Sequence, residues 1–361
     1  MSQQSNSLSQ LALQKFKKDF WGVFSFGFIV FVGLISIFAY LIAPDNSEYA
    51  NQMHLSIHSK KPGFTVGMLT IPQTIESEQS VFSNILFGKK IQDTEIPITA
   101  YTVENNTLTY TEYASDGLEG MIKSIDMNGL SESEFISNKT FLFGTDKYGR
   151  DLLSRILVGA RISFFIGFIA VFISLVIGIF MGSVAGYFGG RVDAIIMWFI
   201  NVSWSIPTLL LVIAITLALG KGFWQVFIAV GLTMWVEVAR VVRGQVMGVK
   251  EMQYVTAARA LGFNDFRIIT KHILPNIMAP VIVISAANFA AAILIESGLS
   301  FLGVGAQPPM ASWGAMIKDH YNYIILGKPY LALIPGLCIM SLVMAFMLMG
   351  NALRDALDVK S

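Results

Sequence analysis

Residues 253–280 read QYVTAARALGFNDFRIITKHILPNIMAP, a polar, helix-forming segment between two long apolar stretches. Tyr254, Ala257, Ala258 and Leu261 are spaced i, i+3, i+4 and i+7, so they are expected to share one face of a short helix. Two alanines at the centre of that face would let another surface come close. The segment therefore indicates a loop that a partner outside the membrane can bind; an ordinary amphipathic loop lying on the membrane is the alternative.

The residues after this helix predict how it ends. Gly262 is placed to end it, and Asn264 or Asp265 can cap a second helix. Pro275 is expected to stop the hydrogen-bond ladder again, just before the next apolar stretch.

The run TAARALG at residues 256–262, followed by HILPN at residues 272–276, resembles the EAA loop of permease subunits of ABC importers. More narrowly, it is similar to the C-type permeases of dipeptide and oligopeptide importers. The Glu of that signature is Thr256 here and the usual isoleucine is His272, whereas the Ala-Ala, Gly and Leu-Pro positions match. In that family the loop forms a coupling helix that docks into a cleft on a cytoplasmic ATPase. The resemblance implies an ATPase-coupling loop over residues 250–276, with candidate residues Tyr254, Thr256, Ala257, Ala258, Arg259, Gly262, Leu274 and Pro275.

The composition is that of a membrane-embedded chain. Of its 361 residues, 54% are hydrophobic and 14% are charged, against about 25% charged residues in soluble domains. The net charge of +1 gives no electrostatic reason to expect nucleic-acid binding. The single cysteine, Cys338, can form neither an intrachain disulfide nor a metal cluster.

Apolar runs of about 20 residues, the length that crosses a bilayer, recur along the chain. The first, residues 21–43, is longer than the roughly 7–15-residue core of a signal peptide. We expect it to be an uncleaved first span after a cytoplasmic tail of residues 1–20. The predicted fold is an all-α polytopic membrane protein with six transmembrane helices, and the resemblance implies the type I permease fold of ABC importers. The permease core, residues 141–361, holds the other five expected spans, at about residues 162–187, 194–219, 223–241, 277–299 and 330–350.

Residues 44–140 are polar and predict an inserted, β-containing domain between the first two spans. Residues 98–103 and 108–113 alternate apolar and polar around Asn105-Asn106, which predicts a β-hairpin. Residues 65–71 are a further candidate strand. The connection is much shorter in the permeases that the chain resembles, so the resemblance implies no role for this domain.

The stretch GTDKYGRD at residues 144–151 has the glycine spacing of a phosphate-binding loop. Arg150 and Asp151 stand where such a loop needs Lys and Ser or Thr, and a carboxylate would repel phosphate, so we exclude a nucleotide site here. The longer pattern GTDxxGRDxxSRxxxGxR, through Arg161, matches the same permease family. The apolar stripe at residues 152–157 predicts a helix in the outer interface before the chain enters the membrane.

Two features of the spans concern helix packing. Gly178, Gly182 and Gly186 have the four-residue spacing that lets helices approach closely in lipid, with chance as the alternative. Pro207 lies within the third expected span and should kink it.

The basic residues predict the orientation, since short cytoplasmic loops carry an excess of Lys and Arg. Six spans put both termini on one side, together with the coupling loop. That side carries twelve basic residues: Lys15, Lys17, Lys18, Arg191, Arg240, Arg243, Lys250, Arg259, Arg267, Lys271, Arg354 and Lys360. The other carries seven: Lys147, Arg150, Arg155, Arg161, Lys221, Lys318 and Lys328. Both termini and the coupling loop are therefore expected in the cytoplasm, and the inserted domain in the periplasm, for a multi-pass protein of a bacterial inner membrane.

Polar residues in the spans are candidates for function, because polar groups are costly in hydrocarbon. Glu237 and Arg240 are i, i+3 and can form an ion pair. Asn288 could line a polar pathway or bond to a neighbouring helix. Residues 296–303, 307–309 and 312–314 match a second stretch typical of the same permeases. The candidate pathway residues are Asn201, Trp204, Asn288 and Glu296.

The resemblance implies a transport permease without catalytic residues, metal or cofactor of its own. It would supply half of a pathway and pair with a second permease subunit, two cytoplasmic ATPase subunits that bind the ATP, and an extracytoplasmic substrate-binding protein. Dipeptides or oligopeptides are the expected cargo; glutathione or nickel complexes are the alternative.

Two other functions are weighed against transport. A membrane enzyme needs a nucleophile and base, or a metal cluster, at membrane depth. The four histidines lie outside the expected spans and no HExxH motif occurs. A membrane scaffold acting through its external domain is a further alternative.

Overall fold

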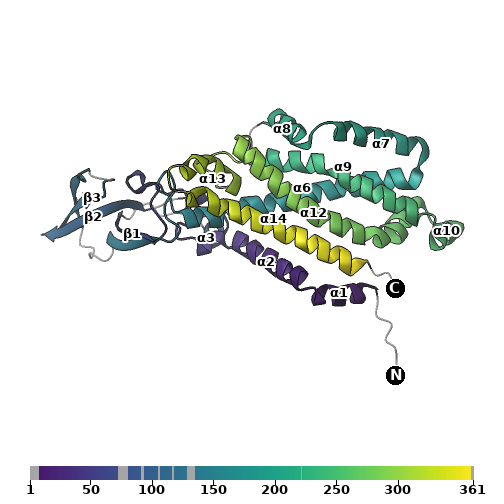
Figure 1. Cartoon of the computed structure of the whole chain (residues 1–361), viewed down its shortest axis with the longest axis horizontal. Coiled ribbons are helices and arrows are strands. Elements are labelled where there is room, and N and C mark those ends of the chain that lie inside the picture. Colours follow the sequence, from purple (N-terminus) through teal and green to yellow (C-terminus); the bar gives the residue numbers. More distant parts are fainter. Residues whose placement is uncertain are drawn as a thin grey trace, which may run out of the picture. The chain divides into compact units, whose positions relative to one another are not determined.

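The protein is described by a computed structural model (Figure 1), which describes residues 8–71, 80–90, 93–104, 106–115, 118–127, 135–220 and 222–358. The chain divides into two compact units. The helical unit comprises Met1–Val32, Ser163–Gln307 and Leu337–Ser361. The sheet unit comprises Gly33–Ile162 and Pro308–Gly336.

Long apolar helices dominate the chain. Five helical stretches in the described part are long and apolar enough to cross a membrane, or six if one bent pair is a single span. The prediction of a mostly helical protein with several membrane-spanning helices is confirmed at this level. The five are α2 (Phe20–Ile37), α6 (Leu152–Phe188), α9 (Phe223–Val249), the stretch ending in α12 (Leu274–Leu302), and α14 (Tyr330–Leu357).

The bent pair consists of α7 (Gly190–Ser205) and α8 (Thr208–Leu219), whose axes differ by 95°. The kink expected at Pro207 is thus a complete break. Proline offers no N–H and forces the residue before it away from helical geometry. Ile206 and Pro207 are accordingly extended, with ψ of 128° and 126°.

Two helices run through positions where a boundary was predicted. In the described residues 135–220, no separate interface helix precedes the second span: α6 is continuous from Leu152 to Phe188. Leu152 and Ile156, from the apolar stripe predicted to face the interface, are buried within the protein. Pro275 does not stop its helix either. A π-helical turn, η3 (Ile268–Ile273), leads directly into α12, and such a local change of hydrogen-bond spacing accommodates a proline that cannot donate.

Glycines let α6 and α9 approach closely. A Cβ on Gly178 would lie 2.5 Å from Val238 Cβ, and one on Gly182 would lie 2.5 Å from the Ala239 carbonyl oxygen. One on Gly186 would meet the Arg243 carbonyl oxygen at 2.8 Å. The packing interpretation of this glycine spacing is therefore confirmed.

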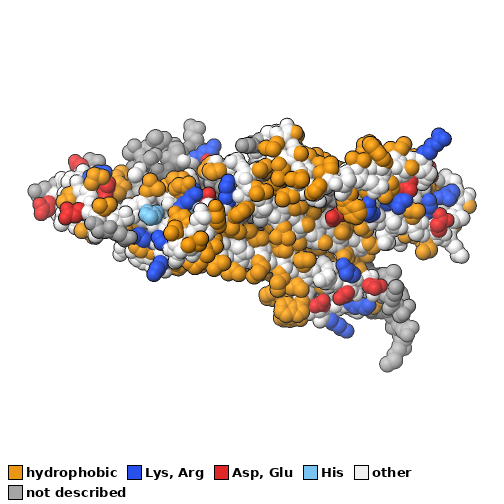
Figure 2. Space-filling model, turned by 45° about the horizontal axis from the view of Figure 1, so that its top comes forward, with side chains coloured by type: hydrophobic (Ala, Val, Ile, Leu, Met, Phe, Trp, Pro, Cys, Tyr) orange, Lys and Arg blue, Asp and Glu red, His pale blue; other side chains and the backbone are white. Residues whose placement is uncertain are grey.

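Large apolar side chains also point outward from the helices. Phe172 and Phe180 on α6 are 67% and 65% exposed, and Trp198 on α7 is 60% exposed. Figure 2 shows hydrophobic side chains over the visible face of the long helices, with charged side chains gathered toward the end that carries α10 (Gln253–Ala260). Such an apolar surface suits contact with lipid or with another membrane subunit.

The inserted segment forms a five-stranded antiparallel sheet in the order β4-β3-β2-β1-β5. The predicted hairpin is confirmed: β2 and β3 pair, with Glu104 opposite Thr107. Asn106 in its turn has a φ of +66°, whereas Asn105 lies outside the described residues. The strands are β1 (Phe64–Ile71), β2 (Thr94–Glu104), β3 (Thr107–Glu112), β4 (Ile122–Asp126) and β5 (Ile136–Phe141).

Alternating residues of the strands face a small apolar core. Leu69 and Leu108 are fully buried there, and Ile98, Tyr110 and Phe135 are nearly so. The shorter helices are α1 (Leu8–Lys18), α3 (Ala39–Ile42), η1 (Glu48–Ala50), η2 (Leu55–Ile57), α4 (Val81–Phe87), α11 (Asp265–Arg267), α13 (Trp313–His320) and η4 (Tyr321–Ile324).

Candidate functional site

The short helix α10 is fixed to the helical unit by one of its faces. Val255 is fully buried and Ala258 is 3% exposed. Both belong to an apolar cluster with residues of α6, α9, η3 and α12. The other members of this cluster are Tyr187, Val238, Val242, Val246, Ile268, Ile273, Ile277 and Val281.

The opposite face of α10 is exposed. Tyr254 is 43% exposed, Leu261 is 74% exposed, and Ala257 between them is exposed too. Three of the four residues predicted to share a face therefore do so, but Ala258 points into the protein. Val255, three residues before Ala258, completes the buried face. The sequence pattern did not reveal it, because it does not belong to the i, i+3, i+4, i+7 set that starts at Tyr254.

The C-terminus of α10 has the geometry of a Schellman motif. Gly262 has a φ of +77°, and its N–H donates to the Arg259 carbonyl oxygen at 3.0 Å. The N–H of Phe263 donates to the Ala258 carbonyl oxygen at 3.2 Å. Gly262 therefore ends the helix as predicted. Its positive φ also turns the chain back so that the buried face of α10 meets η3.

Polar contacts hold the rest of the loop. Asn264 is the cap of the next helix, since its side chain accepts from the Arg267 N–H at 2.8 Å. Asp265 instead accepts a hydrogen bond of 2.6 Å from the Tyr187 hydroxyl. The Arg259 guanidinium lies 5.9 Å from the centre of the Tyr187 ring. The loop is thus tied to the end of α6 by both residues.

The remaining candidate loop residues divide between surface and core. Thr256 and Pro275 are exposed, and Leu274 is half-buried against the apolar cluster under α10. Figure 1 shows α10 projecting at one end of the long helices. One face of α10 is thus anchored to residues of α9 and α12, and its other, partly apolar face is open.

The structure brings together Asn201 and Trp204 of the pathway candidates. The Arg240 guanidinium lies 3.5 Å from the centre of the Trp204 ring, and its Nη2 donates to Asn201 Oδ1 at 3.3 Å. The prediction of a Glu237–Arg240 ion pair is wrong, because the Arg240 side chain contacts Asn201 and Trp204 of α7 instead. Within the described residues, Glu237 has no hydrogen bond or ion pair.

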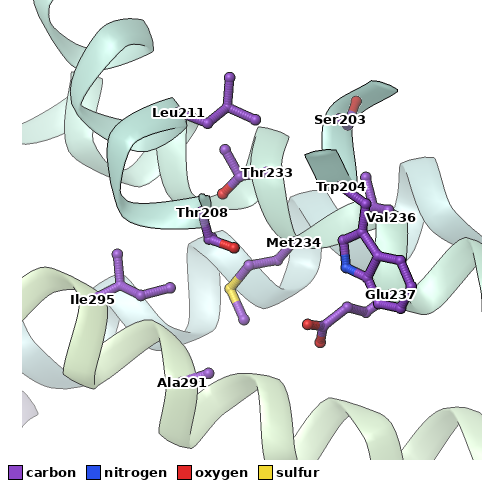
Figure 3. A pocket seen from close by; sticks show the side chains of 10 residues that line it. All are labelled: Ser203, Trp204, Thr208, Leu211, Thr233, Met234, Val236, Glu237, Ala291 and Ile295. Carbon is purple, nitrogen blue, oxygen red and sulfur yellow. The ribbon is translucent and has the colours of Figure 1, made fainter. Parts of the chain in front are cut away.

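A cavity of about 220 Å³ opens beside the α7–α8 break (Figure 3). Trp204 is the only one of the four pathway candidates that lines it. The other lining residues are Ser203, Thr208, Leu211, Thr233, Met234, Val236, Glu237, Ala291 and Ile295.

Asn288 and Glu296 lie elsewhere in α12 and are buried. Glu296 is fully buried, and its Oε1 accepts from the Ser300 hydroxyl at 2.7 Å. Asn288 is 1% exposed, and its Nδ2 finds no acceptor in the part of the chain that the structure describes. Neither residue lines the cavity.

The stretch resembling a phosphate loop is a buried ion-pair network instead. Asp146 is fully buried and accepts from Arg150 Nε at 2.7 Å and from the N–H of Tyr148 at 2.8 Å. Arg150 Nη1 donates to Asn51 Oδ1 at 2.9 Å. The Asp151 side chain accepts from the Ser154 N–H at 2.8 Å. The Tyr148 N–H and the Arg150 guanidinium, which could otherwise bind a phosphate, thus donate to Asp146.

The same network reaches α13. Lys147 Nζ lies 3.0 Å from Asp319 Oδ1, and Trp313 Nε1 donates to the Ile156 carbonyl oxygen at 3.0 Å. Two stretches that were singled out separately in the sequence, residues 144–161 and 312–314, thus meet within the sheet unit.

Comparison with known proteins finds two family matches. Residues 174–359 match the family described as binding-protein-dependent transport system inner membrane component. Residues 7–62 match the N-terminal TM domain of oligopeptide transport permease C. The five strands, between Phe64 and Phe141, fall between the two matched stretches.

Three relatives are each 41–43% identical to this chain over the matched residues. A dipeptide transport system permease protein of Bacillus subtilis (strain 168) is 43% identical over 66% of this chain and 74% of its own length. An oligopeptide transport system permease protein of the same organism is 41% identical, over 62% and 73%. A glutathione transport system permease protein of Pectobacterium atrosepticum is 41% identical, over 60% and 72%.

Proposed function

Since this chain belongs to the family of binding-protein-dependent transport system inner membrane components, we propose that it is a permease subunit of an ATP-driven importer of dipeptides or oligopeptides. It forms half of the translocation pathway and pairs with a second, different permease subunit. Two cytoplasmic ATPase subunits bind and hydrolyse the ATP, and an extracytoplasmic binding protein delivers the cargo. The chain itself needs no cofactor and catalyses no reaction.

The observation that carries this proposal is the two-faced helix α10. Val255 and Ala258 fix it to the cluster that includes α9 and α12, while Tyr254 and Leu261 leave an apolar surface open. A docked ATPase that changes shape with ATP moves α10, and the shared cluster transmits that movement to α9 and α12. A ligand shifts a conformational equilibrium only if it binds the two conformations with different affinity. Here ATP supplies that difference by binding to the ATPase partner.

The proposed cargo rests on the relatives. Two are named for dipeptide and oligopeptide transport, and a third is named for transport of glutathione, which is the second candidate. A nickel complex has no comparable support.

The proposed orientation rests on the basic residues. Both termini and α10 lie in the cytoplasm, and the five-stranded sheet, in the inserted domain of residues 44–140, lies in the periplasm. Of the basic residues counted for this orientation, Lys221 and Lys360 lie outside the described residues.

The test is reconstitution of the importer in vesicles with its second permease subunit, ATPases and binding protein. Replacing exposed Ala257 by Trp is expected to abolish ATPase co-purification and peptide uptake, because the bulky ring blocks close approach to α10. The matched control is Thr102→Trp, on an exposed position of β2, which should retain both. Normal uptake by the Ala257→Trp importer would refute the docking role of α10, and uptake of glutathione or nickel without peptides would refute the proposed cargo.

A further inference from the structure

The cavity beside the α7–α8 break holds one ionisable group. Glu237 is the only acidic or basic residue among its ten lining residues. Figure 3 shows the Glu237 carboxylate and the Thr208 hydroxyl turned toward the middle of the cavity, near Met234. A carboxylate within a candidate membrane helix is costly to keep unless it has a function.

The nearest basic residue in sequence forms no ion pair with this carboxylate. Arg240, one turn later on α9, is held against the Trp204 ring and Asn201. Within the described residues, Glu237 has no ion-pair or hydrogen-bond partner. Its charge is therefore available to something that enters the cavity.

The other polar groups of the cavity favour a cation. The Thr233 hydroxyl already donates its hydrogen to the Val230 carbonyl oxygen at 2.8 Å, so only its lone pairs remain for a ligand. The Trp204 ring at the same wall already has the Arg240 guanidinium 3.5 Å from its centre, so it adds nothing to the attraction for a cation. The Glu237 carboxylate and the hydroxyl lone pairs together suit an ammonium group.

The size of the cavity limits what enters it. Its volume of about 220 Å³ is below the roughly 300 Å³ at which pockets begin to enclose whole drug-sized ligands. One end of a peptide fits this space, and the remainder of the peptide would lie outside it.

We propose that this cavity is a transit subsite in which Glu237 binds the ammonium group of the peptide cargo. Every peptide with a free N-terminus carries such a group, so the subsite recognises cargo without reading its sequence. The inference rests on the proposed function, because it takes the cargo to be a peptide.

The charge of the cavity can be tested without any cargo. In the full importer carrying Cys338→Ala, a cysteine is introduced as Thr208→Cys, and its rates of modification by an ammonium-bearing and by a sulfonate-bearing methanethiosulfonate are compared. With Glu237 present, the ratio of these two rates should be about tenfold higher than with Glu237→Gln, as expected for a nearby unscreened charge. An equal ratio in both backgrounds would overturn the proposal.

The transport test uses vesicles that contain the complete importer and a saturating amount of peptide-loaded binding protein. Glu237→Gln should lower the initial uptake rate about tenfold, as expected for a lost charge-assisted hydrogen bond. Glu237→Asp, which keeps the charge, should recover most of the rate. The matched control is Glu104→Gln, which removes an exposed carboxylate on β2 and should leave uptake unchanged.

ATP hydrolysis stimulated by the loaded binding protein separates the possible outcomes. It should be unchanged in Glu237→Gln, since the carboxylate bonds to no described residue. Unchanged uptake in Glu237→Gln, or joint loss of uptake and ATP hydrolysis, would overturn the subsite. If the unaltered importer moves no peptide, the proposed function fails instead, while the cysteine labelling still reports whether the cavity attracts cations.

Discussion

Gly262 determines how the chain leaves α10, and its effect arises in the backbone. Its φ of +77° costs other residues about 1–2 kcal/mol, although a Cβ there would meet no atom within 4 Å. We expect Gly262→Val to displace α10 and abolish uptake while the protein still reaches the membrane, as measured by vesicle uptake and immunoblotting. Gly244→Ala, in regular helix with equally open space, is the control and should transport normally. Normal uptake in Gly262→Val would count against the docking of α10.

His320 is a second residue with a testable consequence, because it is held as a neutral imidazole. Its Nδ1 lies 2.7 Å from the Met316 carbonyl oxygen, to which it donates, and its Nε2 accepts from the Lys147 N–H at 3.4 Å. Burial lowers the pKa of His320 below its ordinary 6.5, and the nearby Lys147 charge adds to this, although Asp146 and Asp319 oppose it.

The direction of the pH effect follows from that lowered pKa. As the pH falls below about 6.5 the unfolded chain binds the proton first, so the free energy of unfolding falls with it. We expect the thermal stability of the purified chain to drop between pH 7 and pH 5, and His320→Gln to flatten that drop. His58→Gln, at an exposed position, should keep it. A profile that is the same with and without His320 would show that another group is responsible.

At the scale of elements, the contact of α6 with α9 depends on small residues. A Cβ on Gly182 would meet the Ala239 carbonyl oxygen and the Val242 side chain. We expect Gly182→Ala to cost about 1–3 kcal/mol, the usual range for overpacking, and to lower the melting temperature of the detergent-solubilised protein. Gly298→Ala on α12, where a Cβ meets nothing within 4 Å, should melt like the unaltered protein. Equal melting of the two variants would contradict close packing at Gly182.

For the whole molecule, the distribution of basic residues predicts which ends face the cytoplasm. Two single-cysteine variants, each also carrying Cys338→Ala, test this orientation: Ala257→Cys on α10 and Thr102→Cys on β2. Both positions are exposed. A membrane-impermeant maleimide should label Thr102→Cys in cells with only the outer membrane opened, and Ala257→Cys only after the inner membrane is also permeabilised. Labelling of Ala257→Cys in cells with only the outer membrane opened would show the opposite orientation. Coupling of α10 to a cytoplasmic ATPase would then be impossible.

The sequence by itself determined those features that depend on neighbours along the chain. Long apolar runs predicted the membrane helices, Gly262 predicted the end of α10, and the alternation around Asn105-Asn106 predicted the β2–β3 hairpin. Each follows from local backbone preferences and hydrophobic periodicity. Strands β4 and β5 were missed, because their residues are largely exposed or half-buried and pairing with β3 and β1 stabilises them.

Only the tertiary structure decided which side chains meet across the chain. It turned Ala258 inward with Val255, and it joined Asp146 to Arg150 in a buried pair where the sequence showed only phosphate-loop spacing. It also directed Arg240 to Asn201 and Trp204 and left Glu237 unpaired within the described residues. Spacing along one helix shows which residues share a face, but a partner on another helix decides which contact forms, since a guanidinium takes the acceptors and rings that packing brings within reach.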